Sequence, residues 1–413
     1  MQHELQVRIL KELFAQLDAG KNIDAGVQYK MPTSAYVCPE MAASEWRTLF
    51  QNHPQFIGLS GDLPGPDTFF TLDEFGTPVL ATRDSDGVFH AFVNACRHRG
   101  VKVANDTSGK KKRFTCPFHA WTYSSQGELV AIPREEDFGV VDKTCNSLIA
   151  LPCAERDGML WVHPQPGATL DLDELLGELS DELASLNLAR HSYAGGRDID
   201  MPLNWKLAND TFGETYHFQK LHKDTLGQIF YGNNLSYEEF GRHHRFVTAS
   251  KNIDAMRDKP ESEWHLTDGA FIIYYLFPNI QLLINFGRVT LVRIYPDERN
   301  AGHSVTRIRS YFDNKVEEKM QEQQSDSSAC VTAENVYDSC RPVGSVVSLE
   351  AMMEVFYSTV EKEDYAMGAA QQKTAQSGVL EHIIFGRNEP PLHHFHNSFR
   401  DALGLEPLEE VAG

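Results

Sequence analysis

Apolar and polar residues alternate over short runs in the first third of the chain, which is typical of β-strands. Three such runs cover residues 69–72, 78–81 and 88–93, and the turn-forming tetrapeptide Asp84-Ser85-Asp86-Gly87 lies between the second and the third. Gly, Asp and Pro interrupt the pattern repeatedly from about residue 45 to residue 164. This segment is therefore predicted to form a small all-β domain.

The remaining two thirds of the chain carry longer elements. An acidic helical pattern over 171–188 predicts a connector, and a stretch with few helix breakers over 347–376 predicts a long helix. Short connections with Gly or Pro favour an antiparallel sheet for four longer strand-like runs, at 271–276, 280–284, 289–295 and 304–312.

These patterns predict an α+β protein in three segments. Residues 1–44 begin with an amphipathic helix and are expected to pack on the larger domain as a lead-in. Residues 45–164 form the small β domain. Residues 165–413 form the larger domain, in which helices flank the antiparallel sheet. A chain of 413 residues is long enough for two separate cores.

Charge and cysteine content narrow the possible functions. The formal net charge of −20 would repel a polyphosphate backbone, so nucleic acid is not an expected partner. No apolar run approaches the roughly 20 residues that cross a bilayer, and the N-terminus lacks the features of a secretion signal. The seven scattered cysteines make a poor disulfide framework. We therefore expect a cytoplasmic protein without a membrane partner.

Five of the cysteines are expected to be ordinary packing residues: Cys38, Cys145, Cys153, Cys330 and Cys340. Cys96 and Cys116 differ because histidines accompany them, in Cys96-Arg97-His98 and in Cys116-Pro117-Phe118-His119. Two thiolates and two imidazoles on a pair of loops suit a Rieske [2Fe–2S] cluster. A Cys₂His₂ zinc site is the alternative, but structural zinc sites usually place two to four residues between paired ligands.

At these loops the chain resembles the α (catalytic) subunits of Rieske non-haem iron oxygenases in the aromatic ring-hydroxylating dioxygenase family. The resembling segments are 96–100 and 116–123, and the likeness extends to 385–389 and 393–396 near the C-terminus. One departure is Ala120, where the family commonly has Gly. A methyl group there matters only if the backbone requires a positive φ.

A second group of candidate ligands lies in the segment 204–222. His217 and His222 are five residues apart, about 140° around an ideal helix, so they can face one metal only if the helix ends or bulges between them. Two imidazoles and one carboxylate are the ligand set of non-haem Fe(II) oxygenases. The residues themselves leave Glu361, Glu363 and Asp364 open as the carboxylate. The resemblance implies Asp364.

The resemblance also implies roles for residues before His217. Glu214 is expected to lie between His217 and the cluster ligand His119 of the next subunit, where it orients the imidazole and carries the electron path. Such a path implies a closed cyclic oligomer, here a homotrimer. Asn209 and Asp210 are expected to line the pocket or to gate this path, with helix surface as the alternative.

An apolar pocket is expected beside the second site. Its candidate walls are residues 274–279 together with Leu282 and Ile284, and an ordinary sheet core is the alternative.

The two predicted iron sites indicate an oxygenase with a [2Fe–2S] cluster and a mononuclear Fe(II), which uses O₂ to hydroxylate a small, aromatic substrate. Oxidative N- or O-demethylation, for example of a quaternary ammonium compound, is the alternative at the same site. An electron carrier without enzyme activity would not need the extra length. The chain has no G-x-G-x-x-G loop, so electrons are expected from a separate NAD(P)H-dependent reductase, with or without a ferredoxin.

A basic run at 109–113 lies between the two cluster loops of this acidic chain. Complementary charge there would attract an acidic redox partner. A solvated hairpin tip is the alternative.

Overall fold

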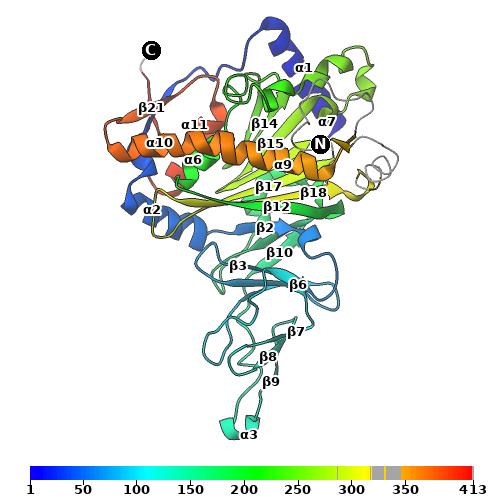
Figure 1. Ribbon diagram of the computed structural model, residues 1–413, viewed down its shortest axis with the longest axis vertical. Helices are drawn as coiled ribbons and strands as arrows, with labels where there is room; N and C mark the ends of the chain where they lie inside the picture. Colours follow the sequence, from blue (N-terminus) through cyan, green and yellow to red (C-terminus); the bar gives the residue numbers. More distant parts are fainter. Residues whose placement is uncertain (286, 317, 319–329, 332–345, 412–413) are drawn as a thin grey trace. The chain divides into compact units, whose positions relative to one another are not determined.

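The computed structural model describes residues 1–285, 287–316, 318, 330–331 and 346–411 (Figure 1). Contacts divide the chain into two compact units. The first comprises Met1–Ser44, Leu176–Leu186 and Tyr193–Gly413, and the second comprises Glu45–Leu175 and Asn187–Ser192.

The second unit is built from three small sheets, with strand orders β5-β4-β3-β6, β7-β8-β9 and β10-β11-β2. The strands predicted at 69–72, 78–81 and 88–93 are confirmed as β3, β4 and β5. The bounds are β2 (Gln55–Leu59), β3 (Thr68–Leu72), β4 (Val79–Arg83), β5 (Phe89–Val93), β6 (Ser108–Lys110), β7 (Arg113–Thr115), β8 (Thr122–Ser124), β9 (Leu129–Ala131), β10 (Cys153–Arg156) and β11 (Met159–Val162).

The first unit is centred on a seven-stranded sheet with the order β12-β18-β17-β16-β15-β14-β13. The four runs predicted from sequence are confirmed as β15 to β18, each antiparallel to its neighbour in the series. The bounds are β12 (His191–Met201), β13 (Ser236–Phe240), β14 (His243–Ala249), β15 (Ala270–Leu276), β16 (Ile280–Asn285), β17 (Arg288–Pro296) and β18 (Ser304–Asp313).

Three strands of this sheet were not predicted, and β14 shows why. It begins with His243, His244 and Arg245, a polar triplet that suggests a loop, yet every residue of the strand is buried. Arg245 is tolerated there because its guanidinium is paired with Glu182, and Glu182 also accepts a hydrogen bond from the Tyr274 hydroxyl at 2.6 Å. These tertiary partners are not visible in a local pattern.

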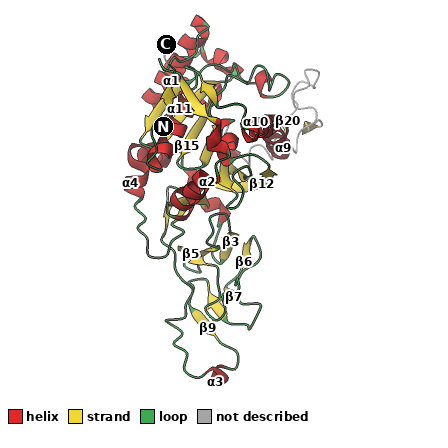
Figure 2. Ribbon diagram, turned by 90° about the vertical axis from the view of Figure 1, so that its left-hand side faces the viewer, coloured by secondary structure: helices red, strands yellow, loops and turns green. Residues whose placement is uncertain are grey.

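The predicted N-terminal helix is confirmed as α1, which is capped by Gly20 with a φ of 59°. The long helix predicted near the C-terminus is also confirmed, but a π-helical turn over Val360–Asp364 divides it into α9 and α10. Figure 2 shows both helices on one side of the strands of this unit. The main helices are α1 (His3–Ala19), α6 (Trp205–Asp210), α9 (Leu349–Thr359), α10 (Tyr365–Ser377) and α11 (Pro390–Ala402).

The predicted acidic connector is confirmed as two short helices, α4 and α5. No helix among the described residues is both long and apolar enough to cross a membrane. Further α-helices and strands are α2 (Pro39–Glu45), α3 (Glu135–Phe138), α4 (Leu172–Leu176), α5 (Ser180–Ala184), α7 (Leu266–Gly269), β1 (Tyr29–Pro32), β19 (Cys330–Val331), β20 (Val346–Val347), β21 (His382–Phe385) and β22 (Glu409–Glu410).

The cysteines outside the predicted cluster do not all behave as packing residues. Cys145 is exposed and its thiol contacts Asp142 at 3.0 Å, so the expectation of a packed thiol is wrong there. Cys38 and Cys153 are half-buried and free. Cys340 and the side chain of Cys330 lie outside the described residues.

Asp84 organises the predicted turn between β4 and β5. Its Oδ1 accepts from the backbone N–H groups of Asp86 and Val88 at 2.9 and 2.8 Å. Its Oδ2 lies 2.9 Å from His90 Nε2 and 3.0 Å from Gln126 Nε2. Burial acts to raise the pKa of this carboxyl, but hydrogen bonds from His90, Val88 and Gln126 outweigh burial and lower the pKa to about 2.

Asp84→Asn is expected to lower the free energy of unfolding by about 2 kcal/mol at pH 7, because it weakens charge-assisted hydrogen bonds to a buried acceptor. The folded-state pKa is depressed, so the carboxylate contribution is complete above the unfolded pKa and is lost as pH falls from about 4 to about 2. The difference between wild type and variant should shrink over that interval in urea unfolding followed by tryptophan fluorescence.

The exposed Asp86→Asn in the same turn is the matched control and should change stability little. A difference between wild type and Asp84→Asn that stays constant down to pH 3 would contradict this role.

Candidate metal centres

The two cluster loops of the second unit have the same backbone design. The N–H of Gly100 donates to the carbonyl of Cys96 at 2.8 Å, and the N–H of Ala120 donates to the carbonyl of Cys116 at 3.0 Å. Each loop closes on a left-handed residue, with φ of 75° at Gly100 and 58° at Ala120. Position 120 therefore does require a positive φ, the case in which a methyl group in place of Gly matters. The Ala120 methyl group lowers the stability of the loop by on the order of 1 kcal/mol.

The side chains of these loops are arranged as a cluster would require. Cys96 and Cys116 are buried in the core of the unit, whereas His98 is half-buried and His119 is exposed. The two imidazole rings lie 4.6 Å apart between centroids, and His98 stacks on Trp121 at 5.1 Å with an interplanar angle of 13°. Sulfur ligands thus lie inward and nitrogen ligands outward.

A hydrogen bond near Cys96 and the lowered pKa of His98 agree with this ligand set. Burial and the neighbouring His119 lower the pKa of His98, which favours the neutral imidazole that binds a metal. The Tyr123 hydroxyl lies 3.4 Å from Cys96 Sγ and accepts from the backbone N–H of Arg97 at 2.9 Å. Hydrogen bonds to cluster sulfurs tune the reduction potential. Cys96, His98, Cys116 and His119 therefore fit a [2Fe–2S] cluster.

The second candidate centre follows the end of helix α6. This helix stops at Asp210, so His217 and His222 lie in a series of turns, and the condition for both to face one metal is met. The backbone of this loop passes very close to Gly227. A Cβ on Gly227 would lie 2.8 Å from the carbonyl oxygen of His222 and 3.0 Å from that of Phe218. The close approach explains a glycine here.

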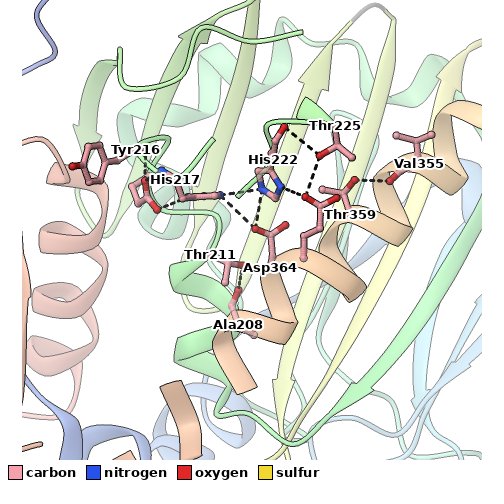
Figure 3. A network of polar contacts seen from close by, with 11 residues as sticks. Ala208, Thr211, Tyr216, His217, His222, Thr225, Val355, Thr359 and Asp364 are labelled. Carbon is pink, nitrogen blue, oxygen red and sulfur yellow. Dashed lines mark hydrogen bonds and ion pairs between the residues drawn. The ribbon is translucent and has the colours of Figure 1, made fainter. Parts of the chain in front are cut away.

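The three predicted ligands converge. His217 Nε2 and His222 Nε2 are 3.1 Å apart, and Asp364 Oδ1 lies 3.4 Å from the first and 3.1 Å from the second (Figure 3). One ligand atom from each residue lies within 4.8 Å of the others. This is the only such group of three among the residues that the structure describes. Two imidazoles and one carboxylate suit a ferrous ion with open positions.

Asp364 reaches the histidines from the π-helical turn at the end of α9. Such turns widen a helix locally and are frequent at functional sites. The same turn directs Glu363 to the other side of His222, where its Oε2 lies 2.8 Å from Nδ1 and accepts from the Thr225 hydroxyl at 3.1 Å. Sequence reasoning treated Glu363 only as a rival ligand and missed this supporting contact.

Glu214 supports the other imidazole. Its carboxylate contacts His217 Nδ1 and accepts from the backbone N–H groups of Tyr216 and His217, the latter at 3.2 Å. Both imidazoles therefore have a carboxylate at Nδ1 and direct Nε2 toward Asp364. Carboxylates in this position fix the tautomer and orientation of a metal-binding histidine.

Electrostatics couple the three ligands. Burial acts to lower the pKa of His217, but hydrogen bonds to Asp364 and Glu214 outweigh it and raise the pKa to about 10. Burial acts to raise the pKa of Asp364, but both imidazoles hold it below its ordinary value. A metal must displace the imidazole protons, so its binding releases protons and weakens as pH falls.

A cavity opens beside this centre and is partly open to solvent. Most of its walls are apolar, which suits a small organic molecule. The lining residues are Thr211, Phe212, Glu214, His217, Phe218, His222, Leu226, Phe271, Ile273, Leu283, Phe356, Thr359, Val360 and Asp364.

The walls predicted from the strands are wrong, and the sheet core given as the alternative is what these residues form. The cavity is lined by Ile273 and Leu283, which are register partners in β15 and β16, and not by Leu282, Ile284 or the segment 274–279. Successive residues of a strand point to opposite faces, so Tyr274, Leu276, Leu282 and Ile284 belong to the core on the other face. Tyr275 shares the face of Ile273 but is not a lining residue, and residues 277–279 lie between the two strands.

Asn209 and Asp210 are not among the lining residues. Asn209 is buried, and its Oδ1 accepts from Gln281 Nε2 at 2.9 Å. Asp210 binds the Tyr36 hydroxyl at 2.8 Å and His396 Nε2 at 2.7 Å. His396, to which sequence reasoning assigned no role, thus joins α11 to the end of α6.

Comparison with known proteins supports both centres. The Rieske [2Fe-2S] domain family matches residues 53–149, and the ring hydroxylating alpha subunit (catalytic domain) family matches residues 188–405. These domains imply a Rieske cluster and a mononuclear iron.

Among curated relatives, the glycine betaine monooxygenase oxygenase subunit of Chromohalobacter salexigens is 30% identical, over 49% of this chain and 45% of the relative. The anthranilate 1,2-dioxygenase large subunit of Acinetobacter baylyi is also 30% identical, over 49% and 44%. The matches thus span less than half the length of these relatives.

Solved structures share the fold over almost the whole chain. A quaternary ammonium Rieske monooxygenase in complex with L-carnitine has a TM-score of 0.71 at 18% identity, covering 92% of this chain and 97% of that one. Naphthalene 1,2-dioxygenase from Rhodococcus sp. bound to indole has a TM-score of 0.68 at 18% identity, covering 97% and 98%. The catalytic family model alone matches more than half of this chain, which therefore belongs to the ring-hydroxylating α-subunit family.

Proposed function

We propose that this chain is a terminal oxygenase that takes electrons from a partner reductase and uses O₂ to hydroxylate a small, aromatic substrate. The observation that carries the proposal is the convergence of His217, His222 and Asp364 on one side of an apolar cavity. A binding module would not need three ligand atoms within 4.8 Å beside such a cavity.

In this reaction the protein would position the cluster, the iron and the substrate. The four loop ligands would hold the cluster, and His217, His222 and Asp364 would hold the iron. When bound, the cluster supplies single electrons and the iron supplies open positions for O₂. Glu214 and Glu363 keep each Nδ1 occupied, so only Nε2 is available to the metal. The apolar walls limit water around the substrate.

Oxidative demethylation of a quaternary ammonium compound is the second candidate. Four phenylalanines, Phe212, Phe218, Phe271 and Phe356, line the cavity, and aromatic rings attract cations. Glycine betaine and carnitine monooxygenases are among the relatives. The product distinguishes the two reactions, since demethylation releases a one-carbon fragment.

Electron transfer is proposed to pass between subunits of a cyclic homotrimer. His119 is exposed at the tip of its loop, and Glu214 contacts His217 at the iron site. These positions support a path from His119 of one copy to Glu214 and His217 of the next. A solved relative is described as showing inter-subunit electron transfer.

The electron donor is proposed to be an NAD(P)H-dependent reductase, directly or through a ferredoxin, in the cytoplasm. The basic run between the cluster loops supports a docking role, since Lys110, Lys112 and Arg113 are exposed. It connects β6 to β7, which belong to different sheets, so it is not the tip of one hairpin. Lys111 is already engaged, because it pairs with Asp106 and lies 5.4 Å from the centroid of Phe69.

The proposed function is tested with anaerobically reconstituted protein, a reductase and NAD(P)H. Mass spectrometry over a panel of aromatic and methylated-amine substrates is expected to show hydroxylated products. His217→Ala should abolish product and leave the visible cluster spectrum intact, whereas Cys116→Ala should remove that spectrum. Product from His217→Ala, or loss of its visible spectrum, would count against two separate centres.

Glu363→Ala is expected to weaken Fe(II) binding about 10- to 100-fold, because His222 loses the carboxylate that orients it. Glu363→Gln should have a smaller effect, since its amide oxygen can still accept from Nδ1–H. Affinity is measured anaerobically by competition with a chelator. Glu361→Gln is the control, because Glu361 faces Arg197 instead; equal effects at 361 and 363 would show that the contact with His222 is unimportant.

Reversing the charge of Lys110 and Lys112 together is expected to slow reduction of the cluster roughly 10-fold at low ionic strength and to flatten its salt dependence. Stopped-flow absorbance with the reductase measures the rate. The double reversal of exposed Lys21 and Lys259 gives the same change in net charge elsewhere and serves as control. Equal rates in the two double variants would exclude docking at this run.

A further inference from the structure

The cavity beside the iron ligands carries few polar groups of its own. His217, His222 and Asp364 would be occupied by the metal, and Glu214 is engaged with His217. Among the described lining residues, the remaining polar side chains are Thr211 and Thr359. These two hydroxyls are therefore the side-chain groups that could form a hydrogen bond with a polar atom of the substrate.

Both hydroxyls already donate their proton in a hydrogen bond to a backbone carbonyl. Thr211 Oγ1 donates to the carbonyl of Ala208 at 2.9 Å, and Thr359 Oγ1 donates to the carbonyl of Val355 at 2.9 Å (Figure 3). A hydroxyl has one proton and two lone pairs. A substrate group that reaches either oxygen would therefore meet a hydrogen-bond acceptor and no donor.

Apart from the metal that His217, His222 and Asp364 would hold, the cavity offers no counter-ion for a charged substrate. No lysine or arginine is among its described lining residues. A carboxylate that does not bind the metal would lose its hydration without gaining a donor, which costs several kcal/mol. The phenylalanine rings could attract a cation. No carboxylate is available to balance its charge, because Asp364 is shared by two imidazoles and Glu214 contacts His217. In addition, the Arg288 guanidinium lies 5.6 Å from the centroid of Phe356, and its positive charge would repel a cation bound near that ring.

We propose that this cavity selects an uncharged, ring-sized molecule that carries an O–H or N–H group, and that Thr211 and Thr359 accept the hydrogen bond from that group. The inference rests on the proposed function in one respect only, namely that the same cavity is the substrate site. It separates this chain from enzymes whose substrates carry a carboxylate, and it makes the two threonines specificity residues.

The test compares indole with benzofuran, which has nearly the same shape but an ether oxygen in place of the N–H. Binding to the anaerobic holoenzyme without reductase is measured by titration calorimetry, so no turnover is required. Indole should bind more tightly than benzofuran. In the Thr211→Val/Thr359→Val variant this preference should fall about 2- to 10-fold, the range of one net hydrogen bond, while benzofuran affinity stays near wild type.

Thr374→Val is the matched control. Thr374 lies exposed on α10, and its hydroxyl also donates to a carbonyl four residues earlier, that of Ala370 at 3.3 Å. It should leave both affinities unchanged. Visible and circular-dichroism spectra check that the double variant is folded and loaded. Equal loss of indole and benzofuran binding in the double variant would overturn the role of the threonines.

Charged probes complete the test. Benzoate and benzyltrimethylammonium should each bind more weakly than indole, and tighter binding of either would overturn the selection for an uncharged molecule. The outcomes separate the two proposals. Threonine-dependent indole binding without oxygenated product from any substrate would contradict only the proposed function. Efficient hydroxylation of benzoate would support the proposed function and contradict this inference.

Discussion

The candidate iron site depends on one constraint: each imidazole is held at Nδ1 by a carboxylate. Glu214 contacts His217, and Glu363 lies 2.8 Å from His222 Nδ1. With Nδ1 engaged, each ring can direct only Nε2 to the third carboxylate, Asp364. A histidine that is free to rotate would lose side-chain entropy when it binds a metal. Here the two rings are already fixed in the folded protein, so metal binding does not carry that entropic cost.

Two interruptions of regular helix make this arrangement possible. Helix α6 ends at Asp210, which releases the following turns to bring His217 and His222 together. The π-helical turn between α9 and α10 lets adjacent residues, Glu363 and Asp364, contact opposite edges of the same imidazole. The cluster loops of the other unit also depend on local backbone, since each closes on a left-handed residue, Gly100 or Ala120.

The residues that line the cavity, and not the fold, determine which substrate can bind. In the proposed function, His217, His222, Asp364 and the two supporting carboxylates serve the reaction. The phenylalanines and the two threonines would determine which substrate binds. Since family membership covers many reactions, substrate preference has to be argued from those walls. Here the walls supply acceptors and aromatic faces but no lysine, arginine or uncommitted hydroxyl proton among the described lining residues.

Much of this protein could be predicted from its sequence, because the information was local. The spacing of Cys96, His98, Cys116 and His119 indicated the cluster, and alternating runs indicated β3 to β5 and β15 to β18. The sequence also narrowed the third iron ligand to three neighbouring carboxylates, but their directions depend on a π-helical turn that no residue pattern announced.

Tertiary structure decided the rest, since it concerns contacts between distant segments. The polar start of β14 is buried because Glu182, far away in sequence, pairs with Arg245. The cavity is lined by Ile273 and Leu283, and not by their neighbours, because packing determines which face of a strand meets the iron site. A sequence records which side chains are present, but which of them share a cavity depends on the register and direction of elements that meet only after folding.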